Sequence, residues 1–174
     1  EIFIFFAGHG LASTDGKDLY LLPYDGEPRL LEDTALLRSE IFDSINNIKP
    51  KSVTVFLDTC YSGQTREKDM ILNDARPISI VPLESNVPEN FTVFSASSGS
   101  EISGSLPEAN HGLFSYYIMK GLEGDADTNN DRKITTGELH SYVRSNVIRQ
   151  AIRLGREQTP QLQGDNLRVL VEFN

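Results

Sequence analysis

One cysteine and one of the three histidines of this chain occupy matching places in the sequence. His9 comes shortly after the apolar run 2–6, and Cys60 comes shortly after the run 53–57. Runs of this length, rich in β-branched and aromatic side chains, predict strands that are covered on both faces of a sheet. Reactive groups of open α/β sheets gather at the carboxyl ends of such strands. A thiol beside an imidazole there is suited to nucleophilic catalysis, because the imidazole raises the fraction of thiolate.

Glycines flank both residues and suit a site that a substrate backbone approaches closely. Gly8 and Gly10 stand on either side of His9, and Gly63 follows Cys60. The backbone amides of Gly10 and Cys60 could form an oxyanion hole. A second interpretation stays open, because a free cysteine is often a buried structural residue.

The elements that must position these residues alternate between strands and helices. Apolar runs predict strands, and apolar residues at helical spacing predict helices. Alternation of this kind indicates an α/β sandwich with a mainly parallel sheet. We expect strands at about 1–6, 53–58, 91–95 and 167–172, a short hairpin piece at 19–22, and helices at 38–48, 111–122 with Asn110 as N-cap, and 136–154.

Composition excludes several classes of function. A length of 174 residues suits one domain with a sizeable core, so we treat residues 1–174 as one domain. The net charge of -9 argues against binding to nucleic acid or to an anionic membrane surface, and it favours cationic partners such as metal ions or basic peptides. A single cysteine cannot form an internal disulfide, which favours a reducing, cytoplasmic compartment.

Two stretches of the chain are unusual for a compact domain. Residues 62–90 are irregular and rich in proline, which is long for a connection without structure and typical of a functional or disordered loop. The chain also enters an apolar strand directly after Glu1. A buried parallel strand needs neighbours, so we expect that earlier strands are missing and that this missing N-terminal segment is a partner of the domain.

With its motifs taken together, the chain resembles the caspase-like cysteine peptidases, and within them the metacaspases and their bacterial counterparts, the orthocaspases. The resemblance covers nearly the whole chain. It is carried by Ala7-Gly8-His9-Gly10, Leu22-Pro23-Tyr24-Asp25, Asp58-Thr59-Cys60-Tyr61-Ser62-Gly63, Phe94-Ser95-Ala96-Ser97-Ser98 and His111-Gly112-Leu113-Phe114-Ser115-Tyr116.

The resemblance implies both a fold and a reaction. The fold is the three-layer caspase-hemoglobinase-like sandwich, with two strands ahead of the strand that precedes His9. The reaction is peptide hydrolysis through a thioester, in which Cys60 attacks the carbonyl and His9 protonates the leaving amine and then activates water. We expect no organic cofactor.

The resemblance also implies a substrate pocket that prefers basic residues. Metacaspases carry an Asp two positions before the nucleophile, where this chain has Asp58, and a carboxylate there complements Arg or Lys ahead of the scissile bond. Ser97 stands in a segment that lines the pocket in the family. A second pocket acid of metacaspases has no Asp counterpart here, and Glu101 is the candidate substitute. Without the resemblance, Asp58 could equally be a turn residue that caps a neighbouring amide.

Basic residues after Cys60 are candidates for self-processing. The loop contains Arg66, Lys68 and Arg76, and relatives of caspases are often cut in this linker during activation. A solvated charged loop is the plain alternative.

Two other functions compete with peptidase activity. Cys60 and Arg66 form C-x5-R, the phosphate-binding pattern of cysteine phosphatases, although Thr59 stands where those enzymes usually have His and His9 would have no role. The chain could also be a silent caspase-like domain that binds calcium or acts as a scaffold.

Residues 125–138 fit the register of an EF-hand calcium loop. The expected oxygen ligands are Asp127, Asn129, Asp131, the carbonyl of Lys133, and Glu138 at the bidentate position. Arg132 stands where the sharp turn prefers Gly. The alternative is structural, because Thr135 and Glu138 form a capping box for the following helix.

Three further features receive only local roles. We interpret His111 as a structural residue near the start of a helix. We expect His140 to lie on the solvated side of the last helix, and we assign residues 158–161 only to a turn.

Overall fold

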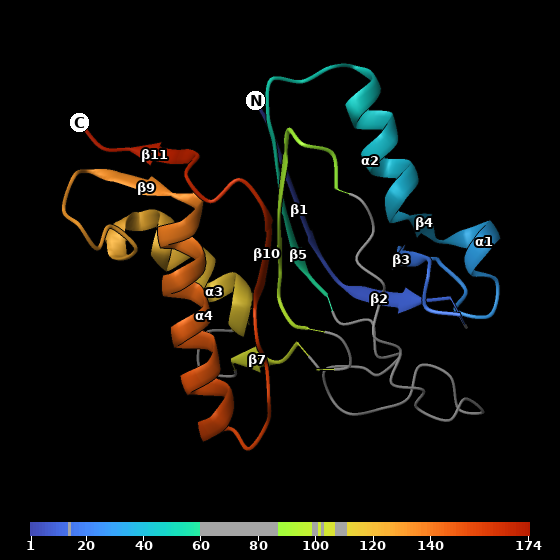
Figure 1. Ribbon diagram of the computed structural model, residues 1–174. Coiled ribbons are helices and arrows are strands. Elements are labelled where there is room, and N and C mark those ends of the chain that lie inside the picture. The colour runs from blue at the N-terminus through green and yellow to red at the C-terminus, as the bar shows by residue number, and fades with distance from the viewer. Residues whose placement is uncertain (14, 60–86, 99–100, 102, 107–110) are drawn as a thin grey trace.

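A four-stranded sheet forms the centre of the molecule. The computed structural model describes residues 1–13, 15–59, 87–98, 101, 103–106 and 111–174. The sheet has the order β1-β5-β6-β10, with β1, β5 and β6 parallel and β10 antiparallel (Figure 1). Its strands are β1 (Ile2–Ala7), β5 (Val53–Asp58), β6 (Phe91–Ser95) and β10 (Gln161–Gly164). The expected α/β architecture with a mainly parallel sheet is confirmed.

Helices cover the two faces of this sheet and give three layers (Figure 1). Helix α2 (Arg38–Asn47) lies on one face, and α3 (Leu113–Lys120) and α4 (Thr136–Arg153) lie on the other. The period-two alternation of β5 divides its side chains between two apolar clusters. One cluster, on the side of α2, contains Phe42, Val53, Val55, Leu57, Phe91 and Val93. The other, on the side of α3 and α4, contains Phe56, Phe94, Leu113, Phe114, Ile134, Leu139, Val143 and Val147.

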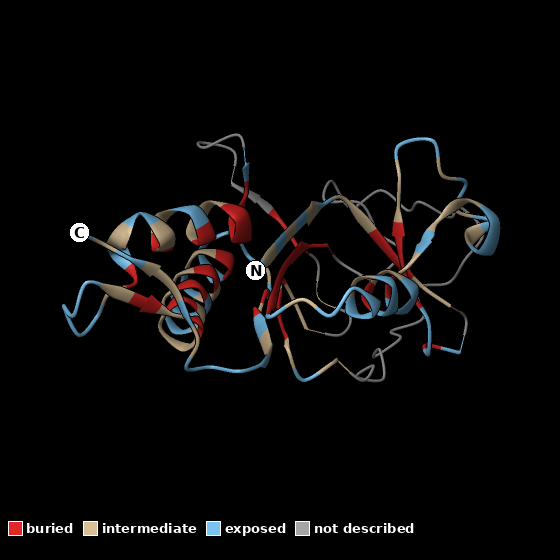
Figure 2. Ribbon diagram, turned by 90° about the horizontal axis from the view of Figure 1, so that it is seen from above, coloured by how far each residue is buried: buried red, intermediate tan, exposed pale blue. Residues whose placement is uncertain are grey.

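Smaller elements surround the central sheet. A three-stranded sheet at the end of β1 contains β2 (His9–Ala12), β3 (Leu19–Leu22) and β4 (Leu36–Leu37), with the short helix α1 (Leu31–Thr34) beside it. Two short strands, β7 (Ser105–Leu106) and β8 (His111–Gly112), pair with each other before α3. A π-helical turn, η2 (Gly121–Asp125), continues α3, and β9 (Lys133–Thr135) pairs with β11 (Val169–Glu172). Burial is concentrated in the central strands and in the helix faces turned toward them (Figure 2).

The last strands differ from the sequence prediction. The segment predicted as a strand at 167–172 forms β11, which pairs antiparallel with β9 in a separate ribbon. The fourth strand of the main sheet is instead β10, and Gln161, which we assigned to a turn, is its first residue. The reason is that β10 lacks an apolar run, so its position depends on pairing with β6 and not on its own pattern.

The helices follow their predicted spans, with differences at the ends. The helix predicted at 111–122 begins at Leu113, after Gly112 as N-cap, and passes into the π-helical turn; Asn110 lies outside the described residues. Helix α4 begins as predicted, because Thr135 and Glu138 form a reciprocal capping box. The helix ends at Arg153, with Leu154 as C-cap, and Gly155 follows at φ 70. The amides of Gly155 and Arg156 donate to the carbonyls of Ile152 and Ala151, which is a Schellman motif.

Within the part of the chain that the structure describes, no helix combines the length and the apolar character needed to cross a membrane.

The close approach of β10 to β6 depends on Gly164. Its φ is +103, and a Cβ atom there would lie 2.3 Å from the carbonyl oxygen of Phe91. We expect Gly164→Ala to lower the free energy of unfolding by about 2–4 kcal/mol, because backbone strain and a backbone clash add together. Urea denaturation measures this loss.

Gly155→Ala is the matched control, because Gly155 also has a positive φ, +70, but has no atom within 4 Å of the added Cβ. Its loss should be about 1 kcal/mol, from backbone strain alone. Equal losses in the two variants would contradict the close contact between β10 and β6.

Candidate active site

The register between β1 and β5 sets the geometry of the predicted site. Ala7 pairs with Asp58 at the carboxyl ends of these parallel strands, and the amide of Gly8 donates to the carbonyl of Asp58 at 3.3 Å. His9 stands two residues beyond Ala7, and Cys60 stands two residues beyond Asp58 in the sequence. Cys60 itself lies outside the described residues. The strand that precedes each predicted catalytic residue is therefore confirmed, and the two strands are neighbours.

His9 begins a strand that turns away from the central sheet. In β2 it pairs with Leu22 of β3, and Gly10, which follows it, is buried. Gly8 lies between β1 and β2, where the backbone passes close to the ring of Phe6. A Cβ atom added at Gly8 would lie 3.1 Å from this ring. His9 is half-buried, so its imidazole belongs to the accessible rim of this edge.

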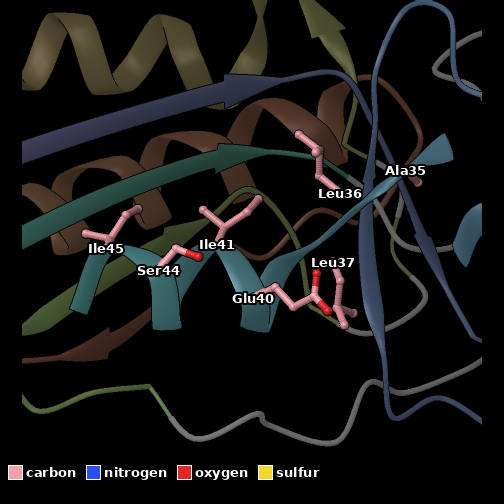
Figure 3. Close-up of a pocket in the computed structure, with 7 residues that line it drawn as sticks. All are labelled: Ala35, Leu36, Leu37, Glu40, Ile41, Ser44 and Ile45. Carbon is pink, nitrogen blue, oxygen red and sulfur yellow. The ribbon is translucent and has the colours of Figure 1, made fainter. Parts of the chain in front are cut away.

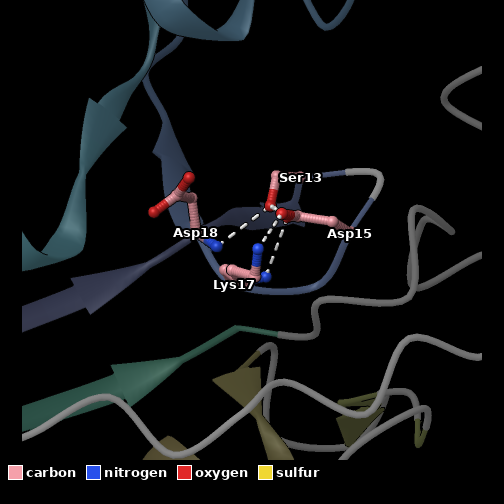
Figure 4. A network of polar contacts seen from close by, with 4 residues as sticks. All are labelled: Ser13, Asp15, Lys17 and Asp18. Carbon is pink, nitrogen blue, oxygen red and sulfur yellow. Dashed lines mark hydrogen bonds and ion pairs between the residues drawn. The ribbon is translucent and has the colours of Figure 1, made fainter.

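Polar contacts at its far end hold the β2–β3 hairpin that carries His9 (Figure 4). The hydroxyl of Ser13 donates to Asp15 at 2.7 Å and accepts from the amide of Asp18 at 2.9 Å. Lys17 adds an ion pair with Asp15 at 3.0 Å. The hydrogen bond from Ser13, followed by that from Lys17, lowers the pKa of Asp15 to about 2. The turn is closed by Ser13, whose hydroxyl accepts the amide of Asp18 and whose amide donates to the carbonyl of Asp18.

Asp58 is the most deeply buried acid near the predicted site. The residue is 0% exposed, and its side chain lies on the face of β5 that packs against α3. Its carboxylate accepts the hydroxyl of Ser103 at 2.6 Å, and it also accepts the hydroxyl and the amide of Ser115 on α3. A buried carboxylate needs such donors, because removal of its charge from water is otherwise costly. Asp58 thus ends a strand and accepts one backbone amide and two serine hydroxyls, so its interpretation as an amide-capping residue agrees with these contacts, and its role in a substrate pocket stays a prediction.

Ser97 and Glu101 lie beside this centre with different partners. The hydroxyl of Ser97 donates to the carbonyl of Thr59 at 3.5 Å, which places Ser97 next to the residue that precedes Cys60. The carboxylate of Glu101 accepts the amide of Ser98 at 3.1 Å and both the amide and the hydroxyl of Thr159, at 2.6 and 2.9 Å. Both oxygens of Glu101 thus serve protein contacts, and its role as a second pocket acid stays a prediction.

Gln158 is the residue of this region that the sequence pattern did not reveal. It is 1% exposed, although glutamine is mostly a surface residue. Its side-chain oxygen accepts the amide of Gly104 at 3.0 Å, and its side-chain nitrogen donates to the carbonyl of Ala96 at 3.1 Å. These partners lie 54 and 62 residues away in the chain, so no local signal could have indicated them.

The two remaining histidines are His140 and His111, and His140 differs from its expected place. His140 was expected to be solvated, but it is half-buried and its Nε2 donates to the carbonyl of Pro160 at 3.2 Å. Burial lowers the pKa of His140. The solvated assignment fails because the segment 158–160 folds back over this side of α4. His111 is exposed and belongs to β8, ahead of the helix.

Hydrogen bonds from its own side chains hold the backbone of the EF-hand-like loop. Asp127 accepts the amides of Asp131 and Arg132, and Arg132 adopts the left-handed φ of 65 at the position where EF-hands prefer glycine. The side chain of Asn129 also accepts the amide of Asp131. Glu138 accepts from Thr135 in the capping box, and Lys133 forms an ion pair with Glu172. Among the described residues, no three Asp, Glu, His or Cys side chains are grouped as a metal ion requires. These residue types do not include Asn129 or the backbone carbonyl of Lys133, and calcium binding stays a prediction.

The predicted processing residues Arg66, Lys68 and Arg76 lie outside the described residues, as does most of the loop 62–90. Self-cleavage in this loop therefore also stays a prediction.

A shallow groove lies away from this site. It has a volume of about 350 Å³ and runs between β4 and the first turns of α2 (Figure 3). Its lining residues are Ala35, Leu36, Leu37, Glu40, Ile41, Ser44 and Ile45. None of the predicted site residues contributes to it.

Comparison with known proteins identifies the family. The family model of the peptidase C14 caspase domain matches residues 2–171. A crystal structure of a protein from Geobacter sulfurreducens is similar, with 16% identity and a TM-score of 0.53, over 95% of this chain and 67% of that chain. At this identity the likeness shows the fold alone. No curated protein matches the chain.

The hydroxyl of Ser115 stabilises the buried Asp58 carboxylate. We expect Ser115→Ala to lower the free energy of unfolding by about 1–3 kcal/mol, because a buried charged acceptor loses a donor. Chemical denaturation measures the change. Ser145→Ala is the control, since the hydroxyl of Ser145 is exposed and bonds only within α4. A loss for Ser115→Ala no greater than for this control would contradict the stabilising contact.

Proposed function

The chain belongs to the caspase domain family of cysteine peptidases, and we propose that it is an endopeptidase that cleaves after Arg or Lys through Cys60 and His9. The proposal includes the metacaspase or orthocaspase type, self-cleavage in the loop after Cys60, and an influence of calcium. The family match carries the general activity. The features of this chain support the finer assignment.

The observation that most supports a Cys60–His9 pair is the register of β1 on β5. Ala7 and Asp58 are direct partners at the ends of adjacent parallel strands, which lie about 4.8 Å apart. His9 and Cys60 each follow their partner by two residues, so the chain can bring both to the same edge of the sheet.

In this proposal the reaction has two halves. The Cys60 thiolate attacks the peptide carbonyl, the C–N bond breaks, and protonated His9 gives its proton to the leaving amine. The acyl group then remains on Cys60 as a thioester. Neutral His9 takes a proton from water, the hydroxide adds to the thioester carbonyl, and the C–S bond breaks to release the carboxylic acid and the Cys60 thiolate, with His9 again protonated. The amides of Gly10 and Cys60 are the proposed donors to the tetrahedral oxyanion.

Asp58 is the proposed determinant of basic specificity. Its carboxylate lies two residues before Cys60, and donors from Ser103 and Ser115 hold it in one orientation. A fixed carboxylate binds a guanidinium or an ammonium by charge-assisted hydrogen bonds. The net charge of the chain, -9, also favours cationic substrates.

A peptide assay tests the proposed activity. We expect Cys60-dependent hydrolysis of fluorogenic peptides that end in Arg or Lys, little hydrolysis after Asp, and no hydrolysis by Cys60→Ala or His9→Ala protein. Asp58→Asn should lower kcat/KM for the Arg peptide by roughly 10- to 100-fold, because it removes the charge that pairs with the substrate.

Asp43→Asn is the matched control, because it makes the same change at an exposed acid on α2. Absence of Cys60-dependent turnover, with or without calcium, would contradict the peptidase and leave a silent caspase-like domain. Activity toward phosphate esters in that case would favour the C-x5-R alternative.

Self-cleavage has its own measurement. We expect the active protein to be cut after Arg66, Lys68 or Arg76, which intact mass spectrometry detects as two fragments. Cys60→Ala protein should remain whole. Identical masses for the two proteins would remove this part of the proposal.

The influence of calcium is proposed on the donor set of residues 127–138 alone. Asp127, Asn129 and Asp131 would supply side-chain oxygens, Lys133 its carbonyl, and Glu138 would have to leave the capping box. The assay above, repeated in calcium with Asp127→Ala protein, addresses this part independently of the catalytic pair.

A further inference from the structure

The segment that follows α4 contacts the predicted specificity centre through consecutive residues. Gly155, in the left-handed conformation, ends α4, and β10 begins at Gln161, which pairs with Ser95. The intervening residues must therefore run beside the chain that follows β6. Arg156 lies so close to Gly104 that an added Cβ there would stand 1.8 Å from the guanidinium carbon.

Gln158 is the most buried residue of this segment, and both ends of its amide are used. Its oxygen accepts the amide of Gly104 at 3.0 Å, and its nitrogen donates to the carbonyl of Ala96 at 3.1 Å. These two partners fix the orientation of the amide, because a carbonyl can only accept and an N–H can only donate. Gln158 therefore links the end of β6 to the residue directly after Ser103.

Ser103 is the connection from Gln158 to Asp58. Its hydroxyl donates to Asp58 at 2.6 Å, and the side-chain nitrogen of Gln158 approaches the same hydroxyl oxygen at 3.5 Å. A hydroxyl has one proton, so a donor on its oxygen favours the rotamer whose proton points to the carboxylate. The stronger constraint acts on the backbone. The hydrogen bond from the amide of Gly104 to Gln158 fixes Gly104, and Ser103 precedes Gly104 directly in the chain.

A second link reinforces the same placement. Thr159 donates its amide and its hydroxyl to the carboxylate of Glu101 at 2.6 and 2.9 Å. Glu101 thus has a position beside the centre but serves Thr159. Both bonds tie the segment before β10 to the chain that follows β6.

We propose that Gln158 is a positioning residue, which holds Ser103 against Asp58 and thereby sets the selectivity of the site for a cationic side chain. The inference rests on the proposed function of Asp58. Gln158 does not contact the substrate. Its effect reaches the substrate through the orientation of one carboxylate.

The test compares Arg with its uncharged analogue citrulline in otherwise identical fluorogenic peptides. We expect Gln158→Met, which keeps the length of the side chain and removes both hydrogen-bonding ends, to lower kcat/KM for the Arg peptide by roughly 10-fold or more. The citrulline peptide should lose less than about 2-fold, so the Arg preference falls by nearly the full factor. The loss should appear mainly in KM, because Asp58 acts in binding and not in the bond-breaking step.

The ratio separates positioning from simple loss of structure. A smaller folded fraction lowers turnover of both peptides equally and leaves the ratio unchanged. Gln161→Met is the matched control: Gln161 is exposed, its side-chain nitrogen donates to the carbonyl of Thr159, and the ratio should stay at the wild-type value. Ser103→Ala is the second variant, because it removes the hydroxyl and leaves Gln158 bonded to Ala96 and Gly104; it should lower the ratio as Gln158→Met does.

Each outcome of this comparison either supports the proposal or overturns it. A reduced ratio in both variants, with the control unchanged, supports the proposal. An unchanged ratio in either variant overturns it, while Cys60-dependent turnover of the Arg peptide preserves the proposed function. If Gln158→Met does not fold, the contacts of Gln158 are folding elements and the proposal is overturned. Absence of wild-type turnover overturns the proposed function and this inference together.

Discussion

Burial of the Asp58 carboxylate is the constraint on which the active-site end of the molecule depends. A charged group with no exposed surface must receive hydrogen bonds, because its hydration is lost on folding. The donors come from α3 and from the chain after β6, so two further elements must reach the end of β5. The apolar layers alone would not require this meeting, since Phe56 and Phe94 pack against α3 and α4 further along the sheet.

The sheet and the hydrogen bonds perform different tasks at this edge. Strand pairing between β1 and β5 fixes where the chain leaves the sheet after Ala7 and after Asp58. Pairing does not fix how a side chain at a strand end rotates. That orientation comes from directed polar contacts, from Ser103 and Ser115 for Asp58 and from Thr159 for Glu101. Strand pairing and apolar packing thus set where these residues lie, and hydrogen bonds set how their side chains are oriented.

The sequence predicted the parts of the fold that have a local cause. The apolar run of β5 and the capping box of α4 each carry their signal within a few residues, and both elements form as predicted. Strand β10 was missed because Gln161–Gly164 has no apolar alternation and is held by its partner β6. The prediction for 167–172 had the right element but the wrong sheet, because an apolar run does not specify the strand with which it pairs.

The candidate site divides in the same way. His9 and Asp58 could be found because His9 closely follows a recognisable strand and Asp58 ends one, and such a place is visible in one sequence. Gln158 could not be found, since a glutamine in a turn is ordinarily exposed and its partners Ala96 and Gly104 are remote in the chain. His140 was misplaced for the same reason, because the segment that covers it is brought back by the end of α4.

The contacts of residues 158 and 159 also follow from the antiparallel direction of β10. A parallel fourth strand would enter the sheet at the opposite end, far from the carboxyl ends of β5 and β6. Because β10 is antiparallel, the residues that precede it lie at the end of the sheet where β6 finishes, beside Ala96. Reversal of this one strand therefore places a buried amide next to the chain that supports Asp58. The antiparallel β10 thus brings the hydrogen-bonding groups of Gln158 and Thr159 to the carboxyl ends of β5 and β6. With a parallel β10, these groups would lie at the opposite end of the sheet.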